Sequence, residues 1–396
     1  MKIKKLAASA ALVLALASAA LAQAPTGKVK AKTKAKTAAP ISLPPASPSD
    51  PAATPETKML LANLHRLLGR GVMFGHQDDL AYGLNPDGQR WVGDANRSDV
   101  KSVAGAYPAV FGWELGHVEL DSARSLDAVP FAKIRGYVQQ VYAQGGVSTI
   151  SWHLDNPHNG KTAWDTARTV SYILPGGPDH AKYVLYLDRL AGFLGSLKGA
   201  KGEAIPVIFR PFHEHTGSWF WWGEKNCTAA EYQQLWQFTV DYLRGKKQLH
   251  NLLIAYSASE FKSQAHYLER YPGDAYADVL GFDTYYSGTG ASFTSDLARQ
   301  LPLLGQVARE HGKLPALTET GYEKLPAADW WTKILLPAIA PYPLSYVMVW
   351  RNGRPDHFYA PYPGQASAAD FKKFSQDKGI LLENKVAPLR IYTKNL

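Results

Sequence analysis

Cysteine is almost absent from this sequence, since Cys227 is the only one in 396 residues. A single cysteine cannot form an internal disulfide, so an exported form of the chain must be stabilised by core packing alone. The residue directly after Ala20-Leu21-Ala22, the predicted signal-peptide cleavage site, is not a cysteine. This argues against a lipid anchor, which would be attached to a cysteine at the new N-terminus. We expect Cys227 to be a small packed side chain rather than a reactive thiol.

Charged residues are also scarce, at 19% of the chain, and their surplus is positive, with a net charge of +9. Residues 1–58 hold nine lysines against Asp50 and Glu56, a surplus of seven, which leaves only two of the nine charges for residues 59–396. A nearly neutral region of this size argues against nucleic acid or another acidic polymer as its partner. It fits an uncharged substrate.

Long hydrophobic runs are missing too. The apolar stretch from Leu6 to Leu21 is rich in alanine and short for a membrane span. It follows a basic N-terminus and ends in the small-residue pattern at which signal peptides are cleaved. We therefore predict a signal peptide over residues 1–22, export to the periplasm or the medium, and no membrane span after cleavage. Residues 23–58, rich in lysine, proline and alanine, are predicted to be a disordered linker.

Residues 59–396 alternate short apolar runs with amphipathic stretches, which predicts a single α/β catalytic domain. Eight runs have the length and composition of buried parallel strands. They span residues 71–74, 109–113, 147–152, 205–209, 252–256, 279–282, 314–318 and 346–350. Eight strands alternating with helices predict a (β/α)8 TIM barrel. A doubly wound sheet is the alternative, but it requires a glycine-rich phosphate turn after the first strand, where this chain has His76-Gln77-Asp78.

Polar and aromatic side chains follow nearly every predicted strand at its carboxyl end. The richest segment begins with Arg210-Pro-Phe-His213-Glu214 and continues into Trp219 and two further tryptophans. A barrel brings the carboxyl ends of all its strands to one face, where the active sites of such barrels lie. Because Glu214 and Glu319 follow the predicted fourth and seventh strands, we expect them on opposite sides of one cleft.

A pair of carboxyl groups in a cleft lined by aromatic rings is typical of a retaining glycosidase, which needs the two about 5–5.5 Å apart. The rings stack on the faces of sugars. Glu214, beside tryptophans, would have a raised pKa and serve as the acid/base. Glu319 would stay ionised as the nucleophile, with hydrogen bonds from Tyr285 or Arg210.

Histidines and carboxylates at the same strand ends support a second hypothesis, a catalytic metal. The candidate ligands are His76, His153, Asp155, His213 and Asp283. His213 and His215 have the His-x-His spacing of barrel metallohydrolases, although those proteins usually carry the pair after their first strand. Because the carboxyl pair accounts for the chemistry by itself, we expect neither a metal ion nor another cofactor.

The segments at these strand ends resemble glycoside hydrolase family 26, the β-mannanase family of the large clan of retaining (β/α)8 enzymes. Residues 210–223 resemble the family's acid/base segment, and residues 317–321 resemble its nucleophile segment. Further segments match in order, at residues 75–79, 151–157, 281–285 and 349–352. The resemblance covers residues 59–360, which is most of the chain after the predicted signal peptide.

This resemblance implies that Glu214 is the acid/base and Glu319 the nucleophile. The positions that it implies for substrate binding are His153, Trp164, Arg210, His213, Trp219, Tyr285, Trp350 and Arg351. His215-Thr216 departs from the commoner family residues, so the neighbouring sugar subsite is left unassigned.

Mannan as the substrate comes from the resemblance alone. It implies hydrolysis of β-1,4-mannan or mannooligosaccharides by double displacement, with endo and exo action both open. The alternatives are a β-glucanase or xylanase of the same fold, or a barrel that only binds sugar, against which the two intact glutamates argue. We expect a monomer whose partner is its polysaccharide or oligosaccharide substrate.

Overall fold

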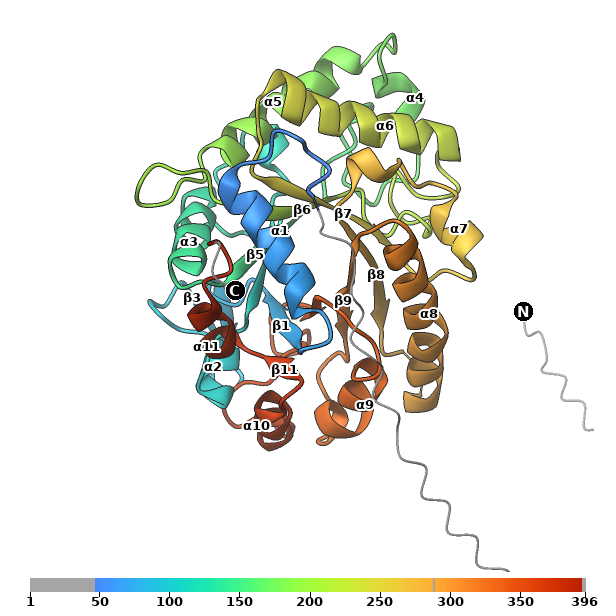
Figure 1. Cartoon of the computed structure of the whole chain (residues 1–396). Coiled ribbons are helices and arrows are strands. Elements are labelled where there is room, and N and C mark those ends of the chain that lie inside the picture. Colours follow the sequence, from blue (N-terminus) through green and yellow to red (C-terminus); the bar gives the residue numbers. More distant parts are fainter. Residues whose placement is uncertain (1–46, 288, 394–396) are drawn as a thin grey trace, which may run out of the picture. The chain divides into compact units, whose positions relative to one another are not determined.

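Eight parallel strands close into a barrel in the computed structural model, which describes residues 47–287 and 289–393 (Figure 1). In barrel order they are β1 (Val72–Gln77), β4 (Val110–Glu114), β5 (Val147–Trp152), β6 (Val207–Pro211), β7 (Leu252–Ala258), β8 (Val279–Tyr285), β9 (Leu314–Gly321) and β10 (Tyr346–Val349). Each strand pairs with the next, and β10 pairs with β1 to close the barrel. The predicted (β/α)8 TIM barrel is confirmed.

Six of the eight barrel strands reach further toward their carboxyl ends than the apolar runs predicted, whereas β5 ends as predicted and β10 one residue earlier. β1 continues to Gln77 and β9 to Gly321, each three residues beyond the predicted end. Backbone pairing with a neighbouring strand does not depend on side-chain polarity, so the ladder continues into the polar residues. The polar strand ends are therefore held in the sheet rather than in free loops.

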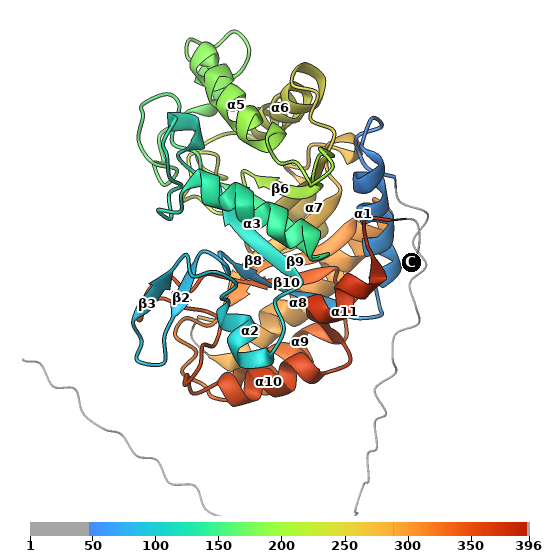
Figure 2. The same ribbon diagram turned by 90° about the vertical axis from the view of Figure 1, so that its left-hand side faces the viewer.

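Helices surround the barrel (Figures 1 and 2). They are α1 (Pro55–Leu67), α2 (Asp99–Ala104), α3 (Phe131–Ala143), α4 (Val170–Ile173), α5 (His180–Gly195), α6 (Ala229–Asp241), α7 (Gln264–Leu268), α8 (Gly290–Glu310), α9 (Leu336–Ile339), α10 (Ala368–Gln376) and α11 (Glu383–Val386). Helix α6 shows why they start where they do. Thr228 and Glu231 form a capping box, and Tyr232, Leu235 and Trp236 of its first turns are buried.

In the part of the chain that the structure describes, three short strands lie outside the barrel and were not predicted. β2 (Tyr82–Leu84) and β3 (Arg90–Val92) form an antiparallel hairpin after β1, and β11 (Ile380–Leu381) pairs with the start of β1. Two or three residues carry too little periodicity to be recognised in a sequence. Figure 2 shows the hairpin projecting from the end of the barrel opposite α1.

The alternation of side chains along each strand decides which residues reach the inside of the barrel. In β6, Val207 and Phe209 pack outward in the core cluster beneath the helices, whereas Ile208 belongs to the inner cluster. Arg210, two residues beyond Ile208, shares its inward face, because side chains two apart on a strand point the same way. The arginine is thereby placed at the inner rim of the carboxyl end.

The packed chain begins before the predicted boundary at residue 59. Helix α1 starts at Pro55, with Thr54 as its cap, and the backbone N–H of Ser49 donates to Asp278 at 2.6 Å. The final part of the predicted linker is thus in contact with the barrel. The predicted signal peptide and linker residues 23–46 lie outside the described residues. Among the helices that the structure describes, none has the length and apolar character required to cross a membrane.

Candidate active site

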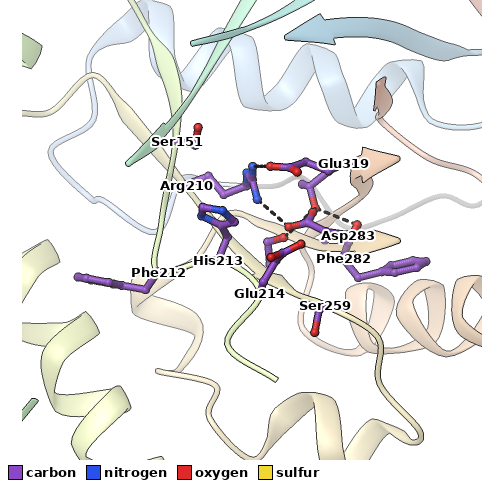
Figure 3. A network of polar contacts seen from close by, with 12 residues as sticks. Ser151, Arg210, Phe212, His213, Glu214, Ser259, Phe282, Asp283 and Glu319 are labelled. Carbon is purple, nitrogen blue, oxygen red and sulfur yellow. Dashed lines mark hydrogen bonds and ion pairs between the residues drawn. The ribbon is translucent and has the colours of Figure 1, made fainter. Parts of the chain in front are cut away.

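One buried arginine joins two carboxylates at the carboxyl end of the barrel (Figure 3). Arg210 on β6 donates from Nη1 to Asp283 Oδ2 on β8 at 2.8 Å, and from Nη2 to Glu319 Oε1 on β9. The arginine is only 1% exposed, so its charge is compensated almost entirely by these two carboxylates. The three strand ends are thereby fixed relative to one another.

Glu319 is held by hydrogen bonds at both of its carboxylate oxygens. Arg210 donates to Oε1, and the Tyr285 hydroxyl donates to Oε2 at 2.5 Å. Burial, together with the charge of Glu319, raises the pKa of Tyr285 well above its usual value, so the phenol remains a donor. Two donors, one of them charged, hold the carboxylate in one orientation.

Asp283 holds Arg210 in place and is itself held by two hydroxyl groups. Its Oδ1 accepts from Ser257 at 3.0 Å and from Thr318 at 2.6 Å, which leaves Oδ2 for Arg210. Sequence reasoning placed Asp283 at a strand end and considered it as a metal ligand, but did not include it among the substrate-binding residues. In the structure it orients Arg210.

Glu214 lies on a sharp turn after β6 and faces this cluster (Figure 3). One carboxylate oxygen from each of Glu214, Asp283 and Glu319 lies within 4.8 Å of the others. This separation of Glu214 from Glu319 fits the roughly 5–5.5 Å between the two carboxyl groups of retaining glycosidases.

The turn that presents Glu214 has an unusual backbone. Phe212 and Glu214 have φ angles of 46° and 55°, in the left-handed region that side-chain-bearing residues rarely adopt. Two buried aromatic donors hold it: the Trp222 indole binds the His213 carbonyl at 2.8 Å, and the Tyr232 hydroxyl binds the Phe212 carbonyl at 2.8 Å. Trp222 of the tryptophan-rich segment and Tyr232 of α6 therefore stabilise the turn.

The environment of Glu214 opposes its ionisation. Burial, followed by the charges of Asp283 and Glu319, raises the pKa of Glu214 well above its usual range. Two contacts lower the pKa of Glu214 in part: a 2.7 Å hydrogen bond from the Trp219 indole N–H to Oε2, and the positive charge of Arg210. A raised pKa is what a general acid requires, so this environment suits Glu214 to that role.

A second series of polar contacts, from Glu114 through His153 to His213, lies beside Glu214. His153 Nδ1 lies 2.7 Å from Glu114 Oε2, and its Nε2 lies 3.0 Å from His213 Nε2. Burial opposes the charge on His153, but the contact with Glu114 outweighs burial and raises the pKa of His153. Burial and the charge of Arg210 lower the pKa of His213 well below its usual value. These opposite shifts favour His153 as the donor and His213 as the acceptor in the contact between their Nε2 atoms.

Aromatic rings lie around His153 and close to Glu214. Trp164 stacks on His153 with ring centroids 5.2 Å apart, and the Trp350 ring lies 6.4 Å from the same histidine. Trp164 and Trp219 are 48% and 43% exposed, which is rare for tryptophan in this chain. Exposed indole faces beside carboxyl groups are suited to stacking on sugar rings.

A cavity of about 760 Å³ opens beside Glu214. Its wall combines polar side chains with the rings of Trp219 and Tyr285, and includes a hydrogen-bonded hydroxyl pair, Thr216 and Ser259, 2.8 Å apart. Thr216 belongs to the dipeptide for which the sequence offered no subsite assignment. The structure shows that its side chain lines this cavity.

Arg351 pairs with an acid that sequence reasoning missed. Its Nη2 lies 3.1 Å from Oδ1 of Asp127, a residue in the loop before α3. Asp127 follows no strand, so no pattern in the sequence marked it. Burial raises the pKa of Asp127 and also that of Asp78, which accepts a 2.6 Å hydrogen bond from Tyr82. Carboxyl groups and a guanidinium in one place can bind the hydroxyls of a sugar.

The five candidate metal ligands do not converge as the metal hypothesis requires. His153 and His213 are neighbours, but His76 Nδ1 is bound to Asp79 at 2.7 Å. The His215 ring packs against Tyr232 and Tyr256, away from His213. The left-handed backbone at Glu214 breaks the extended pattern that would have turned both histidines of the His-x-His pair to one side. Glu214, Asp283 and Glu319 lie close enough to share a cation, but Arg210 already supplies positive charge to two of them.

Comparison with known proteins identifies relatives across most of the chain. Residues 49–334 match the model of glycosyl hydrolase family 26. A mannan endo-1,4-β-mannosidase of Bifidobacterium adolescentis is 35% identical over 363 residues, 85% of this chain but only 35% of the relative. The chain thus spans about a third of the length of that relative.

Solved structures cover the fold more completely. A family 26 β-mannanase from Bacteroides ovatus is 47% identical, with a TM-score of 0.82, over 86% of this chain and 98% of that one. An endo-β-1,4-mannanase double mutant from Cellulomonas fimi is 36% identical, with a TM-score of 0.80, over 88% of this chain and 80% of that one.

Proposed function

The chain belongs to glycosyl hydrolase family 26, and from that premise we propose that it is an endo-acting β-mannanase that hydrolyses β-1,4-mannan with retention of configuration. The observation that carries the proposal is the pair Glu214 and Glu319, whose carboxylate oxygens approach within 4.8 Å at the carboxyl face of the barrel. The substrate and the endo action are supported by the printed names of the relatives from Bifidobacterium adolescentis and Cellulomonas fimi.

In the first step, Glu319 attacks the anomeric carbon while Glu214 protonates the glycosidic oxygen of the departing sugar. The raised pKa of Glu214 keeps a proton available near neutral pH. Arg210 and Tyr285, which donate to the two oxygens of Glu319, orient the nucleophile for attack. The negative charge of Glu319 is lost as the covalent bond forms. Because that charge helps to raise the pKa of Glu214, its loss lowers this pKa and makes it easier for Glu214 to release its proton.

In the second step, water replaces the departed sugar and Glu214 acts as a base. It takes a proton from the water as the oxygen attacks the anomeric carbon, and Glu319 leaves as a carboxylate. Arg210, only 1% exposed, then again neutralises the restored charge. Two displacements at one carbon restore the original configuration.

The remaining predicted residues supply binding surfaces. We assign the Trp164 and Trp350 rings, with His153 between them, to sugar contacts beside the cleaved bond. Arg351 with Asp127 would bind hydroxyl groups of a more distant sugar. The cavity beside Glu214 would receive the leaving group. Export through an N-terminal signal peptide and action as a monomer are part of the same proposal.

The proposal is tested by product analysis on β-1,4-mannan, galactomannan and mannohexaose, with β-1,4-glucan and xylan as comparisons. We expect mannan and mannohexaose to be cut internally, so that oligosaccharides of several lengths appear early. Release of a single small product from one end of the chain would contradict endo action and indicate an exo-acting enzyme. Preference for glucan or xylan would replace mannan as the substrate, and binding without hydrolysis of any polymer would make the barrel a sugar-binding protein.

A further inference from the structure

Trp219 makes a contact that stacking on a sugar does not require. Its indole N–H donates to Glu214 Oε2 at 2.7 Å, and its ring, 43% exposed, borders the same cavity as that carboxyl. Trp164 is the matched comparison. It is similarly exposed and stacks on His153, but among the described residues its indole N–H makes no hydrogen bond to Glu214. The direction of the Trp219 N–H therefore needs its own explanation.

The loop fixes the Trp219 ring in this orientation. A Cβ on Gly217 would lie 2.3 Å from the Trp219 ring, and a Cβ on Gly223 would lie 2.4 Å from the Gly217 carbonyl oxygen. The Gly217 amide in turn donates to the Glu214 carbonyl at 2.8 Å. Both glycines are thus needed for the indole to lie over the loop that carries Glu214.

The two oxygens of the Glu214 carboxyl are not equivalent. Oε2 accepts from Trp219, whereas Oε1 has no hydrogen-bond partner in the part of the chain that the structure describes. A protonated carboxyl carries its hydrogen on one oxygen, and the other, the carbonyl oxygen, is the better acceptor. The hydrogen bond from Trp219 to Oε2 therefore favours the hydrogen on Oε1.

We propose that Trp219 is a positioning residue for the acid/base, whose N–H keeps the transferable proton of Glu214 on Oε1. In the first step that proton moves from Oε1 to the leaving glycosidic oxygen, and Oε2 stays bound to the indole. In the second step the same Oε1 takes a proton from the attacking water. The inference rests on the proposed function, because it matters only if Glu214 transfers a proton.

The pH dependence of kcat/KM distinguishes a positioning role for Trp219 from a role in stacking on the sugar. An N–H donor favours the ionised carboxyl, so its removal raises the pKa of Glu214. The basic limb of kcat/KM, where the free enzyme loses its acid, then moves to higher pH. Other groups also act on Glu214, and a variant at position 219 leaves them in place. The nearest are Arg210, Asp283, Tyr285 and Glu319, and His213 precedes Glu214 in the chain. Those further along the cavity are Glu224, Glu260, Lys262 and His266.

The test is Trp219→Phe, which keeps an aromatic face but removes the donor, with Trp164→Phe as the matched control. We expect kcat/KM on mannohexaose to fall about tenfold in Trp219→Phe, the size of one lost hydrogen bond in the transition state. The loss should be smaller on 2,4-dinitrophenyl β-mannobioside, whose leaving group needs little protonation. The basic limb should move to higher pH in Trp219→Phe and stay in place in Trp164→Phe.

Equal losses on both substrates with an unmoved basic limb would overturn the inference and leave Trp219 as a stacking residue. Glu214→Gln, measured in parallel, separates this outcome from failure of the proposed function. If Glu214→Gln hydrolyses mannohexaose at the wild-type rate, Glu214 is not the acid and the proposed function itself fails. Thermal unfolding of each variant confirms that the fold is intact.

Discussion

Glu319→Ala is expected to abolish hydrolysis of mannan, because the substitution removes the carboxylate that we propose as the nucleophile and that Arg210 and Tyr285 bind. Loss of a residue of this kind lowers the rate by several powers of ten. Azide added to the variant should occupy the space left by the carboxylate and attack the anomeric carbon in its place. Because azide attacks once and no second displacement follows, the mannosyl azide should have the inverted configuration. Activated aryl mannobioside is the substrate for this assay.

The control is Glu310→Ala, which removes an exposed glutamate near the end of α8 and should leave the rate unchanged. The buried Arg210 charge is only partly compensated in Glu319→Ala, so its thermal unfolding is measured alongside activity. Substantial hydrolysis of mannan by a folded Glu319→Ala variant, without azide, would refute the nucleophile assignment.

Glu214→Ala is expected to lose activity in proportion to how much the leaving group needs a proton. General acid assistance contributes about 10²–10⁴-fold, so the loss on mannohexaose should fall in that range. On 2,4-dinitrophenyl β-mannobioside the first step needs little assistance and should stay fast. The second step then lacks its base, so the glycosyl-enzyme should accumulate and the phenol should appear as a burst.

Mass spectrometry of the intact protein measures the intermediate directly. The expected mass increase is that of one mannobiosyl group, attached to the peptide that contains Glu319. Similar losses on the oligosaccharide and the activated substrate, with no adduct, would show that Glu214 does not transfer the proton.

The barrel could be predicted from the sequence because each strand is an apolar run bounded by polar residues. The same pattern located Glu214 and Glu319, since both follow such runs and a barrel gathers the carboxyl ends of its strands. Asp283 and Glu114 directly follow apolar runs in the sequence, but their contacts with Arg210 and His153 could not be predicted from it. Those contacts depend on how adjacent strands are aligned, which one strand's sequence does not specify.

Other features depend on the turn after β6 and could not be read from residue types. The extended pattern predicted that His213 and His215 face the same way, but the left-handed φ of Glu214 separates them. That backbone is maintained by Trp222 and Tyr232, which are brought to it by packing. The Trp219 hydrogen bond arises from the same turn. Asp127 was missed because it lies in a loop and is identified only by its contact with Arg351.

The central claim is that Glu214 and Glu319 cleave a β-mannosidic bond by two displacements at one carbon. The most direct test follows the anomeric proton of the newly formed reducing end by NMR during hydrolysis of mannohexaose, before mutarotation equilibrates the product. The account predicts that the β anomer appears first and the α anomer later. Initial appearance of the α anomer would mean a single displacement and would contradict the account.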